Sequence, residues 1–337
     1  MADRLFRWET LLFLLCLAVL GYGAVSTSGF ADPDNVRFLL LDYSEVALLA
    51  FALLPIVLTG EIDLSVASVI GFCSALTGKL WNAGMSFETI VPVVLLAGLA
   101  LGAVNAVLVV KFGLPSLAVT IGTLGLYRGL AYVVLGDGAV TGFPENYRPL
   151  AIEYGTVVVV VVGVLAAVTV HFTPLGRALF AIGLGPEATR FSGIRVDRVK
   201  MLLFCVSGAL AALASLIYTL RYNSARADNA NGLELAAVAA VLLGGVSIFG
   251  GRGSVFGVAT ALLLMAGLRN LMFLNDVSNE VQNVVTGLLL IVSVLVPVAA
   301  GAIARRRRPQ PPAGTQPSRS PDPVGAAVSH GLNEEDR

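Results

Sequence analysis

The sequence predicts an all-α integral membrane protein with about ten transmembrane helices, some of them interrupted. The first observation behind this prediction is composition. Of the 337 residues, 56% are hydrophobic and 13% are charged, whereas an ordinary soluble domain carries roughly 25% charged residues. The second is a mean hydropathy of +0.84. The third is spacing, because a spanning helix needs roughly 20 mostly apolar residues and this chain contains one such run after another.

Ten apolar segments are the predicted spans. The first follows two arginines and has no clean cleavage site, so we interpret it as an uncleaved helix rather than a signal peptide. The second and third segments, and the eighth and ninth, have no real loop between them. The segments are residues 8–27, 45–60, 64–80, 89–110, 115–135, 155–172, 199–219, 233–249, 254–273 and 281–301.

The placement of Lys and Arg in the connections predicts the orientation, because cytoplasmic loops carry an excess of these residues. With the N-terminus inside, thirteen Lys and Arg fall on the cytoplasmic ends and loops and six on the opposite side. An even number of spans then places both termini in the cytoplasm.

The C-terminal stretch differs in composition from the rest. It begins with four consecutive arginines and continues with a run that holds six of the 15 prolines. Such a sequence cannot build a packed core. We therefore predict a transmembrane domain over residues 1–304 and a disordered, Pro-rich cytoplasmic tail over residues 305–337. We interpret the arginines as a membrane-surface anchor rather than as a nucleic-acid site.

The stretch LTGEIDLSVASV, residues 58–69, places Glu61 and Asp63 in a very apolar region. An ionisable group at the bilayer centre costs about 2.5–3.5 kcal/mol on insertion scales, so it normally faces a protein interior or a watery cavity. The apolar run before Gly60 starts near Val46 and is too short to cross upright, which predicts a helix break within the membrane. We expect Asp63 to cap the helix that follows. A hydrated loop at the interface is the alternative.

Other polar and small residues interrupt the apolar segments. They can line a pathway, or they can hold helices together as the G-x-x-x-G motif of Gly98 and Gly102 would. A second stretch, LLGGVSIFGGRGSVFG at residues 242–257, resembles the first in having a glycine-containing turn between two short apolar runs. Transporters often carry repeated interrupted helices. Chance similarity is the alternative, since Gly, Val and Leu are common here. The candidate pathway or bracing residues are Thr59, Glu61, Asp63, Ser65, Asn105 and Thr120.

Enzymatic and metal-binding motifs are missing from the sequence. It contains no G-x-x-x-x-G-K-[ST], G-x-S-x-G or H-E-x-x-H pattern. The two histidines and three cysteines stand singly, without the spacing of metal ligands. We predict no catalytic residues, no metal and no cofactor, and a process driven by energy from elsewhere.

The connection over residues 173–200 is neither apolar enough to span nor rich enough in Gly and Ser to be slack. We expect a short ordered helix-loop at the membrane surface. It would present Phe180, Ile182 and Phe191 beside Arg190 and Arg195.

Four stretches follow one another along the chain: TGEIDLSVASV (59–69), LPSLAVTIGTLGLYRGLA (114–131), LGRALFAIGLGPEATRFSGIRVDRVK (175–200) and LAAVAAVLLGGVSIFGGRGSVFG (235–257). In order and spacing they resemble the permease subunits of bacterial ABC importers for ribose and related monosaccharides. One departure is Glu61, where family members usually carry a second glycine.

The resemblance implies an ABC importer permease architecture in the bacterial inner (plasma) membrane, embedded in the lipid bilayer. It implies a second permease subunit in a homo- or heterodimer, a separate cytoplasmic ABC ATPase and an extracytoplasmic sugar-binding protein, with no nucleic acid as partner. It also implies that the 173–200 connection seats in the ATPase as a coupling segment. The candidate residues of that segment are Gly176, Ala181, Gly183, Glu187, Ala188, Ser192 and Gly193.

On this basis we expect the chain to move a ribose-like monosaccharide into the cytoplasm by alternating access. A branched-chain amino acid or nucleoside permease shares the architecture and is one alternative. A zwitterionic amino acid would require paired charges, and Glu61 and Asp63 have no evident buried cationic partner except Arg128. A proton-coupled secondary transporter that uses Glu61 and Asp63 is the alternative from a different class.

Overall fold

The computed structural model describes residues 2–306, with side chains placed for residues 8–293 and residue 295. Residues 307–337, which make up nearly all of the predicted tail, lie outside this range. Residues Met1–Val296 form one compact unit, and the fold and the sites below belong to it. In the second unit, the described residues 297–306 continue the last helix.

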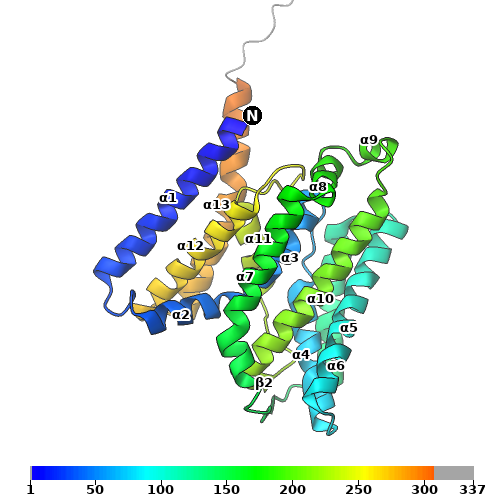
Figure 1. Ribbon diagram of the computed structural model, residues 1–337, viewed down its shortest axis with the longest axis vertical. Helices are drawn as coiled ribbons and strands as arrows, with labels where there is room; N and C mark the ends of the chain where they lie inside the picture. Colours follow the sequence, from blue (N-terminus) through cyan, green and yellow to red (C-terminus); the bar gives the residue numbers. More distant parts are fainter. Residues whose placement is uncertain (1, 307–337) are drawn as a thin grey trace, which may run out of the picture. The chain divides into compact units, whose positions relative to one another are not determined.

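The described part of the chain is predominantly helical, as expected for the predicted all-α class (Figure 1). Its only strands, β1 (Val140–Thr141) and β2 (Ser224–Ala225), pair antiparallel. The helices are α1 (Ala2–Ser26), α2 (Pro33–Asp42), α3 (Ser44–Leu58), α4 (Val66–Asn82), α5 (Phe87–Ala106) with a π-helical turn η1 (Val107–Lys111), α6 (Ser116–Leu135), α7 (Arg148–Phe172), α8 (Pro174–Leu184), α9 (Pro186–Phe191), α10 (Val196–Tyr222), α11 (Leu233–Leu243), α12 (Val255–Leu274) and α13 (Asn279–Arg306).

Six of the described helices are long and apolar enough to cross a membrane, namely α1, α5 with η1, α6, α7, α10 and α12. A seventh span results if α2 and α3, which meet at 45°, are counted together. Each of the ten predicted segments contains a helix, but α3, α4 and α11 have only 15, 17 and 11 residues. Three of the predicted spans are therefore short helices that adjoin breaks.

The short helix α3 lies in the interior of the unit. It packs against α7, α10, α11 and α12, and all of its residues except Pro55 are buried. A helix that is apolar on every side is expected to be enclosed by other helices. The position of α3 places the break that follows it inside the protein.

Close backbone approach joins α5 to α10. A β-carbon at Gly98 would lie 2.5 Å from the carbonyl oxygen of Gly208, and one at Gly102 would lie 2.2 Å from that of Phe204. Only glycine allows such proximity. The packing role predicted for the G-x-x-x-G motif is therefore confirmed, with α10 as the partner.

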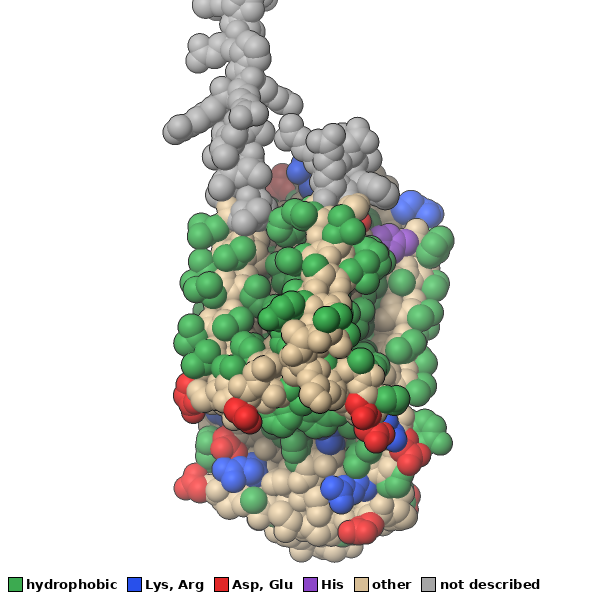
Figure 2. Space-filling view, turned by 90° about the vertical axis from the view of Figure 1, so that its left-hand side faces the viewer, with side chains coloured by type: hydrophobic (Ala, Val, Ile, Leu, Met, Phe, Trp, Pro, Cys, Tyr) green, Lys and Arg blue, Asp and Glu red, His purple; other side chains and the backbone are tan. Residues whose placement is uncertain are grey.

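The outward-facing side chains are largely apolar. Figure 2 shows hydrophobic side chains over most of one face, above a level at which acidic and basic side chains gather. Helix α7 contributes Val160, Val164 and Leu165, each more than half exposed. An apolar surface of this extent exceeds what soluble monomers expose and fits contact with lipid.

Helix α1 is attached to a distant part of the chain. It packs along α12. The Trp8 indole Nε1–H donates to the carbonyl of Leu243 at 3.0 Å, and the Ser254 hydroxyl donates to Glu9. These bonds tie the beginning of α1 to both ends of the connection between α11 and α12.

Candidate functional site

Residues 59–65 form a non-helical break between α3 and α4. Within it Thr59, Asp63 and Ser65 are buried, with exposed fractions of 5%, 2% and 0%. Irregular backbone at membrane depth is tolerated only where protein or a water-filled path surrounds it. The burial favours the predicted break inside the protein over a hydrated interfacial loop.

Side chains of α6 form hydrogen bonds with backbone groups in the break that have no helical partner. The Ile62 N–H donates to Ser116 Oγ at 3.1 Å, and the Thr120 hydroxyl donates to the Ile62 carbonyl at 3.3 Å. The Thr59 hydroxyl donates to the Ile56 carbonyl at 2.7 Å, within the last turn of α3. The partly buried Ile62 peptide groups, which lie outside both helices, are thereby hydrogen-bonded.

Asp63 organises the end of the break. Its Oδ1 accepts from the Ser65 N–H at 2.9 Å and from the Ser65 hydroxyl at 2.6 Å, and its Oδ2 accepts from the Ser207 hydroxyl at 3.4 Å. Because α4 begins at Val66, the carboxylate bonds the residue before the helix and not the N–H groups of its first turn. The expected direct cap is corrected to a local turn of the kind that Asp side chains form with the backbone two residues on.

The polar contacts continue away from the break. Ser65 Oγ accepts from Asn105 Nδ2 at 2.7 Å, and Asn105 Oδ1 accepts from the Tyr127 hydroxyl at 3.3 Å. The members of this chain of hydrogen bonds are at most 2% exposed. A satisfied buried polar network of this kind rigidifies its surroundings. We call it the break network, and its members are Asp63, Ser65, Asn105, Tyr127 and Ser207.

The structure thus brings together five of the six predicted pathway residues, and each has a hydrogen-bond partner within the chain. Lining of a pathway by these residues remains a prediction, since their polar atoms are bonded to protein here. Sequence reasoning missed Ser116 and Ser207, which are single hydroxyls at the start of α6 and inside α10. Neither stands out in the sequence, because isolated serines are common in helix packing.

Glu61, the sixth residue, lies apart from the break network. Its carboxylate forms an ion pair with the Lys200 ammonium near the start of α10, and both side chains are about one-sixth exposed, at 17% and 16%. Arg128, the only cationic partner considered from sequence, instead donates to the carbonyls of Ala227 and Asn229 at 2.7 and 2.8 Å. That expectation was wrong because Lys200, counted as a loop charge, reaches back to the break.

Residues 244–254 form the second break, between α11 and α12. The Gly251 N–H donates to the Leu58 carbonyl at the end of α3, at 2.9 Å. Gly183 of α8 fits against both groups, since a β-carbon there would lie 2.1 Å from Leu58 O and 2.2 Å from Gly251 N. We call this meeting of Leu58, Gly183 and Gly251 the glycine junction. It joins α8 to both breaks through backbone contact.

Helices α8 and α9 form the predicted surface element and lie toward the same end of the unit as the start of α1 (Figure 1). Phe191 and Leu184 are 93% and 71% exposed. Ile182 is fully buried, so the expectation that it is presented outward was wrong; it lies on the face of α8 that packs inward. Of the candidate coupling residues, Gly176 is buried, Ala181 and Gly183 are half-buried, and the others are exposed: Glu187, Ala188, Ser192 and Gly193.

A buried ion cluster at the opposite end of α3 was missed from the sequence. Arg221 at the end of α10 pairs with Asp42 at 2.6 Å and with Glu45 at 3.1 Å, and Glu45 is 3% exposed. The sequence offered one signal for this cluster: Glu45 begins the predicted segment 45–60, and Arg221 follows closely after the predicted segment 199–219. In the part of the chain that the structure describes, no three His, Cys, Asp or Glu residues lie close enough to hold a metal ion.

Comparison with known proteins assigns the architecture. A family model described as "Branched-chain amino acid transport system / permease component" matches residues 35–294. The chain belongs to this permease family. It is similar to the autoinducer 2 import system permease protein LsrD of Enterobacter sp. (strain 638), with 33% identity over 302 residues, 86% of this chain and 92% of the relative.

A second relative of this permease is the ribose import permease protein RbsC of Haemophilus influenzae, with 33% identity over 294 residues, 84% of this chain and 91% of the relative. No solved structure matches the chain. The resemblance to permease subunits of ribose-type ABC importers is therefore confirmed. This permease is a multi-pass membrane protein and a transport subunit.

Proposed function

We propose that this permease is the membrane-spanning subunit of an ATP-driven importer that moves a monosaccharide inward by alternating access. Its partners would be a second permease subunit, a cytoplasmic ABC ATPase and an extracytoplasmic sugar-binding protein. The start of α1 and the α8–α9 element would face the cytoplasm. The relatives named for ribose and autoinducer 2 import support small, hydroxyl-rich cargo.

The observation that carries the proposal is the glycine junction. Because no side chain separates Gly183 from Leu58 and Gly251, α8 cannot shift without displacing the ends of both breaks. A partner bound to the exposed Phe191 and Leu184 could therefore move the two breaks together. Rigid-body movement of a packed element is an established way to switch a transporter between states.

The engagement of both carboxylates supports ATP as the energy source. Asp63 accepts hydrogen bonds from Ser65 and Ser207, and Glu61 is paired with Lys200. Each carboxylate therefore has a structural role within the chain that needs no proton coupling. A neutral cargo also fits, although the description of the matching family keeps a branched-chain amino acid as the second candidate.

Reconstitution tests this proposal. The permease, its ATPase and its binding protein would be assembled in proteoliposomes and supplied with labelled D-ribose, autoinducer 2, L-leucine or a nucleoside. We expect uptake of a sugar that requires ATP on the ATPase side and is indifferent to a proton uncoupler. Uptake that persists without ATP and collapses with the uncoupler would support the secondary transporter instead. ATP-driven uptake of leucine alone would move the assignment to the second candidate.

A further inference from the structure

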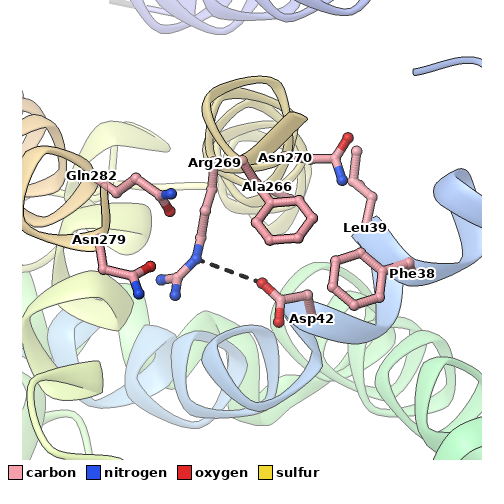
Figure 3. Close-up of a pocket in the computed structure, with 9 residues that line it drawn as sticks. Phe38, Leu39, Asp42, Ala266, Arg269, Asn270, Asn279 and Gln282 are labelled. Carbon is pink, nitrogen blue, oxygen red and sulfur yellow. Dashed lines mark ion pairs between the residues drawn. The ribbon is translucent and has the colours of Figure 1, made fainter. Parts of the chain in front are cut away.

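A cavity of about 180 Å³ lies between α2, the end of α12 and the start of α13 (Figure 3). It lies near the start of α3, at the opposite end of that helix from the first break, and the functional site above does not use it. Its volume greatly exceeds the roughly 10–15 Å³ that one water requires, and it is smaller than the roughly 300–1,000 Å³ of drug-sized sites. The cavity is therefore sized for a small molecule.

The polar groups that face this cavity keep hydrogen-bonding capacity on atoms that the cavity exposes, since no buried side-chain nitrogen or oxygen of the described residues lacks a partner. Arg269 pairs with Asp42 through Nε at 3.5 Å, and among the described residues no hydrogen bond engages its two terminal nitrogens. The Gln282 side chain is anchored by its Nε2, which donates to the Val277 carbonyl at 2.9 Å, and its Oε1 can accept from a molecule in the cavity. Figure 3 shows Gln282, Asn279 and Arg269 directed toward the same space.

Hydrogen bonds and ion pairs outside the cavity fix the positions of the residues that line it. Arg221 binds the other oxygen of Asp42 at 2.6 Å. Asn35 and Asn270 exchange amide hydrogen bonds of 2.9 and 3.0 Å, which fasten α2 to α12. This support gives the site a defined geometry before any ligand binds, which lowers the entropic cost of binding.

Aromatic rings form the apolar part of the site. Phe38 and Phe273 lie 5.8 Å apart between ring centroids, tilted by 32°. Both rings are substantially exposed, at 42% and 55%. Ligand sites typically combine such apolar walls with a few fixed polar groups.

We propose that this cavity binds a neutral polyhydroxy compound of monosaccharide size, and this proposal rests on the proposed function. Arg269 and Asp42 cancel in charge, so the site favours no ion of either sign. Arg269 supplies donors, Asp42 and Gln282 supply acceptors, and Asn279 supplies both, which matches hydroxyl groups that donate and accept at once. The phenylalanine rings suit the C–H faces of a sugar ring. In the proposed orientation the cavity lies toward the extracytoplasmic ends of α1 and α12, where it would receive cargo from the binding protein.

Direct binding to the full-length permease in phosphatidylcholine nanodiscs tests the site. D-ribose would be titrated and followed by saturation-transfer difference NMR, without the ATPase or the binding protein. We expect binding by the unaltered chain, and about tenfold weaker binding for Arg269→Gln and for Gln282→Leu, since each removes a hydrogen bond to the sugar. The matched control is Arg37→Gln, an exposed arginine of α2 outside the cavity, which should bind as the unaltered chain does.

Both test variants should keep the ion cluster that supports the cavity, so weaker binding would not simply report a folding defect. Arg269→Gln leaves Asp42 paired with Arg221, and Gln282→Leu does not touch that ion cluster. Unaltered affinity in both variants, or no ribose binding by the unaltered chain while the reconstituted importer takes up ribose, would overturn the site and leave the proposed function standing. Failure of the unaltered importer to take up any sugar would instead overturn the proposed function.

A lipid headgroup is the competing occupant. Native mass spectrometry of permease in mixed phosphatidylcholine and phosphatidylglycerol would reveal it. Retention of phosphatidylglycerol that disappears in Arg269→Gln, with no ribose signal in any sample, would assign the cavity to lipid phosphate and overturn the sugar site. Equal retention in both samples, together with ribose binding, supports the sugar site.

Discussion

The two breaks of this permease are stabilised in different ways. In the first, residues 59–65, side chains from α5, α6 and α10 bind the released polar groups. In the second, residues 244–254, Gly245, Gly250, Gly251 and Gly253 all have positive φ. Backbone contact at the glycine junction joins this break to α3 and α8, while the Trp8 and Glu9 side chains bond to its two ends. The interior of the first break therefore depends on polar side chains, whereas the close contacts of the second depend on glycines that have no side chain.

This difference bears on the sequence echo between residues 58–71 and 242–257. Both stretches do form breaks, and they touch at the glycine junction. Their stabilising chemistry differs, however, because the first break is built on the hydrogen-bonded chain of Asp63, Ser65 and Asn105, and the second is built on the close backbone contacts of its glycines. Equivalent position in two halves does not require equivalent interactions.

The largest effect is expected from crowding the second break with Gly250→Ala. Gly250 has a φ of +79°, and a β-carbon there would lie 2.7 Å from the Gly60 nitrogen and 2.9 Å from the Gly183 Cα. Left-handed backbone and overpacking together should destabilise the fold by roughly 3 kcal/mol or more. Thermal unfolding of the purified permease in detergent measures this loss.

Gly193→Ala is the matched control for that substitution. Gly193 has a φ of +87° with no atom within 4 Å of a β-carbon, so only the backbone term of about 1–2 kcal/mol applies. Equal losses for the two variants would mean that the crowding at the junction is not important. Gly193 is exposed and belongs to the predicted coupling segment, so a loss of uptake without a matching loss of stability in this variant would indicate a defect in coupling and not in folding.

An intermediate effect is expected from Asn105→Ala in the first break. The substitution leaves the Ser65 and Tyr127 hydroxyls without one partner each and opens a cavity, which should cost about 1–3 kcal/mol. The comparison variant is Asn275→Ala, since Asn275 is exposed near the end of α12. A loss at Asn105 no larger than that at Asn275 would contradict the bracing role of the break network.

The smallest effect is expected from Glu61→Gly. Glu61 pairs with Lys200 outside the break network, and both side chains are about one-sixth exposed. The loss should be about 1 kcal/mol, at the upper end of the range for surface pairs and below that for a fully buried pair. A double-mutant cycle with Lys200→Met measures the coupling between the two residues. We expect unchanged sugar preference in uptake assays. A changed preference would place Glu61 on the path of the sugar.

Much of this architecture could be predicted from the sequence, for reasons visible in single elements. Helix length and hydropathy identify α5, α7 and α12, because lipid imposes those properties on any spanning helix. The break at Gly60 was recognisable because Glu61 and Asp63 conflict with their apolar surroundings. These signals are local, so one sequence suffices to find them.

Other features could not be predicted because they depend on which segments meet. Nothing near Lys200 indicates that it reaches Glu61, 139 positions away. The Ile182 side chain faces inward because α8 packs against α3 and α7, and the local sequence is equally compatible with outward display. The cavity beside Arg269 requires three helices, and no short motif marks it.

The attachment of α1 to Leu243 has a consequence for biogenesis. Trp8 and its acceptor carbonyl are separated by 235 positions in the chain, and synthesis proceeds at about 5–20 residues per second. Helix α1 must therefore reside in the bilayer for roughly 12–47 s before its native partner leaves the ribosome. Its lipid-compatible surface, with Leu11, Leu14 and Leu15 at least half exposed, suits a segment that has to be stable alone during that interval.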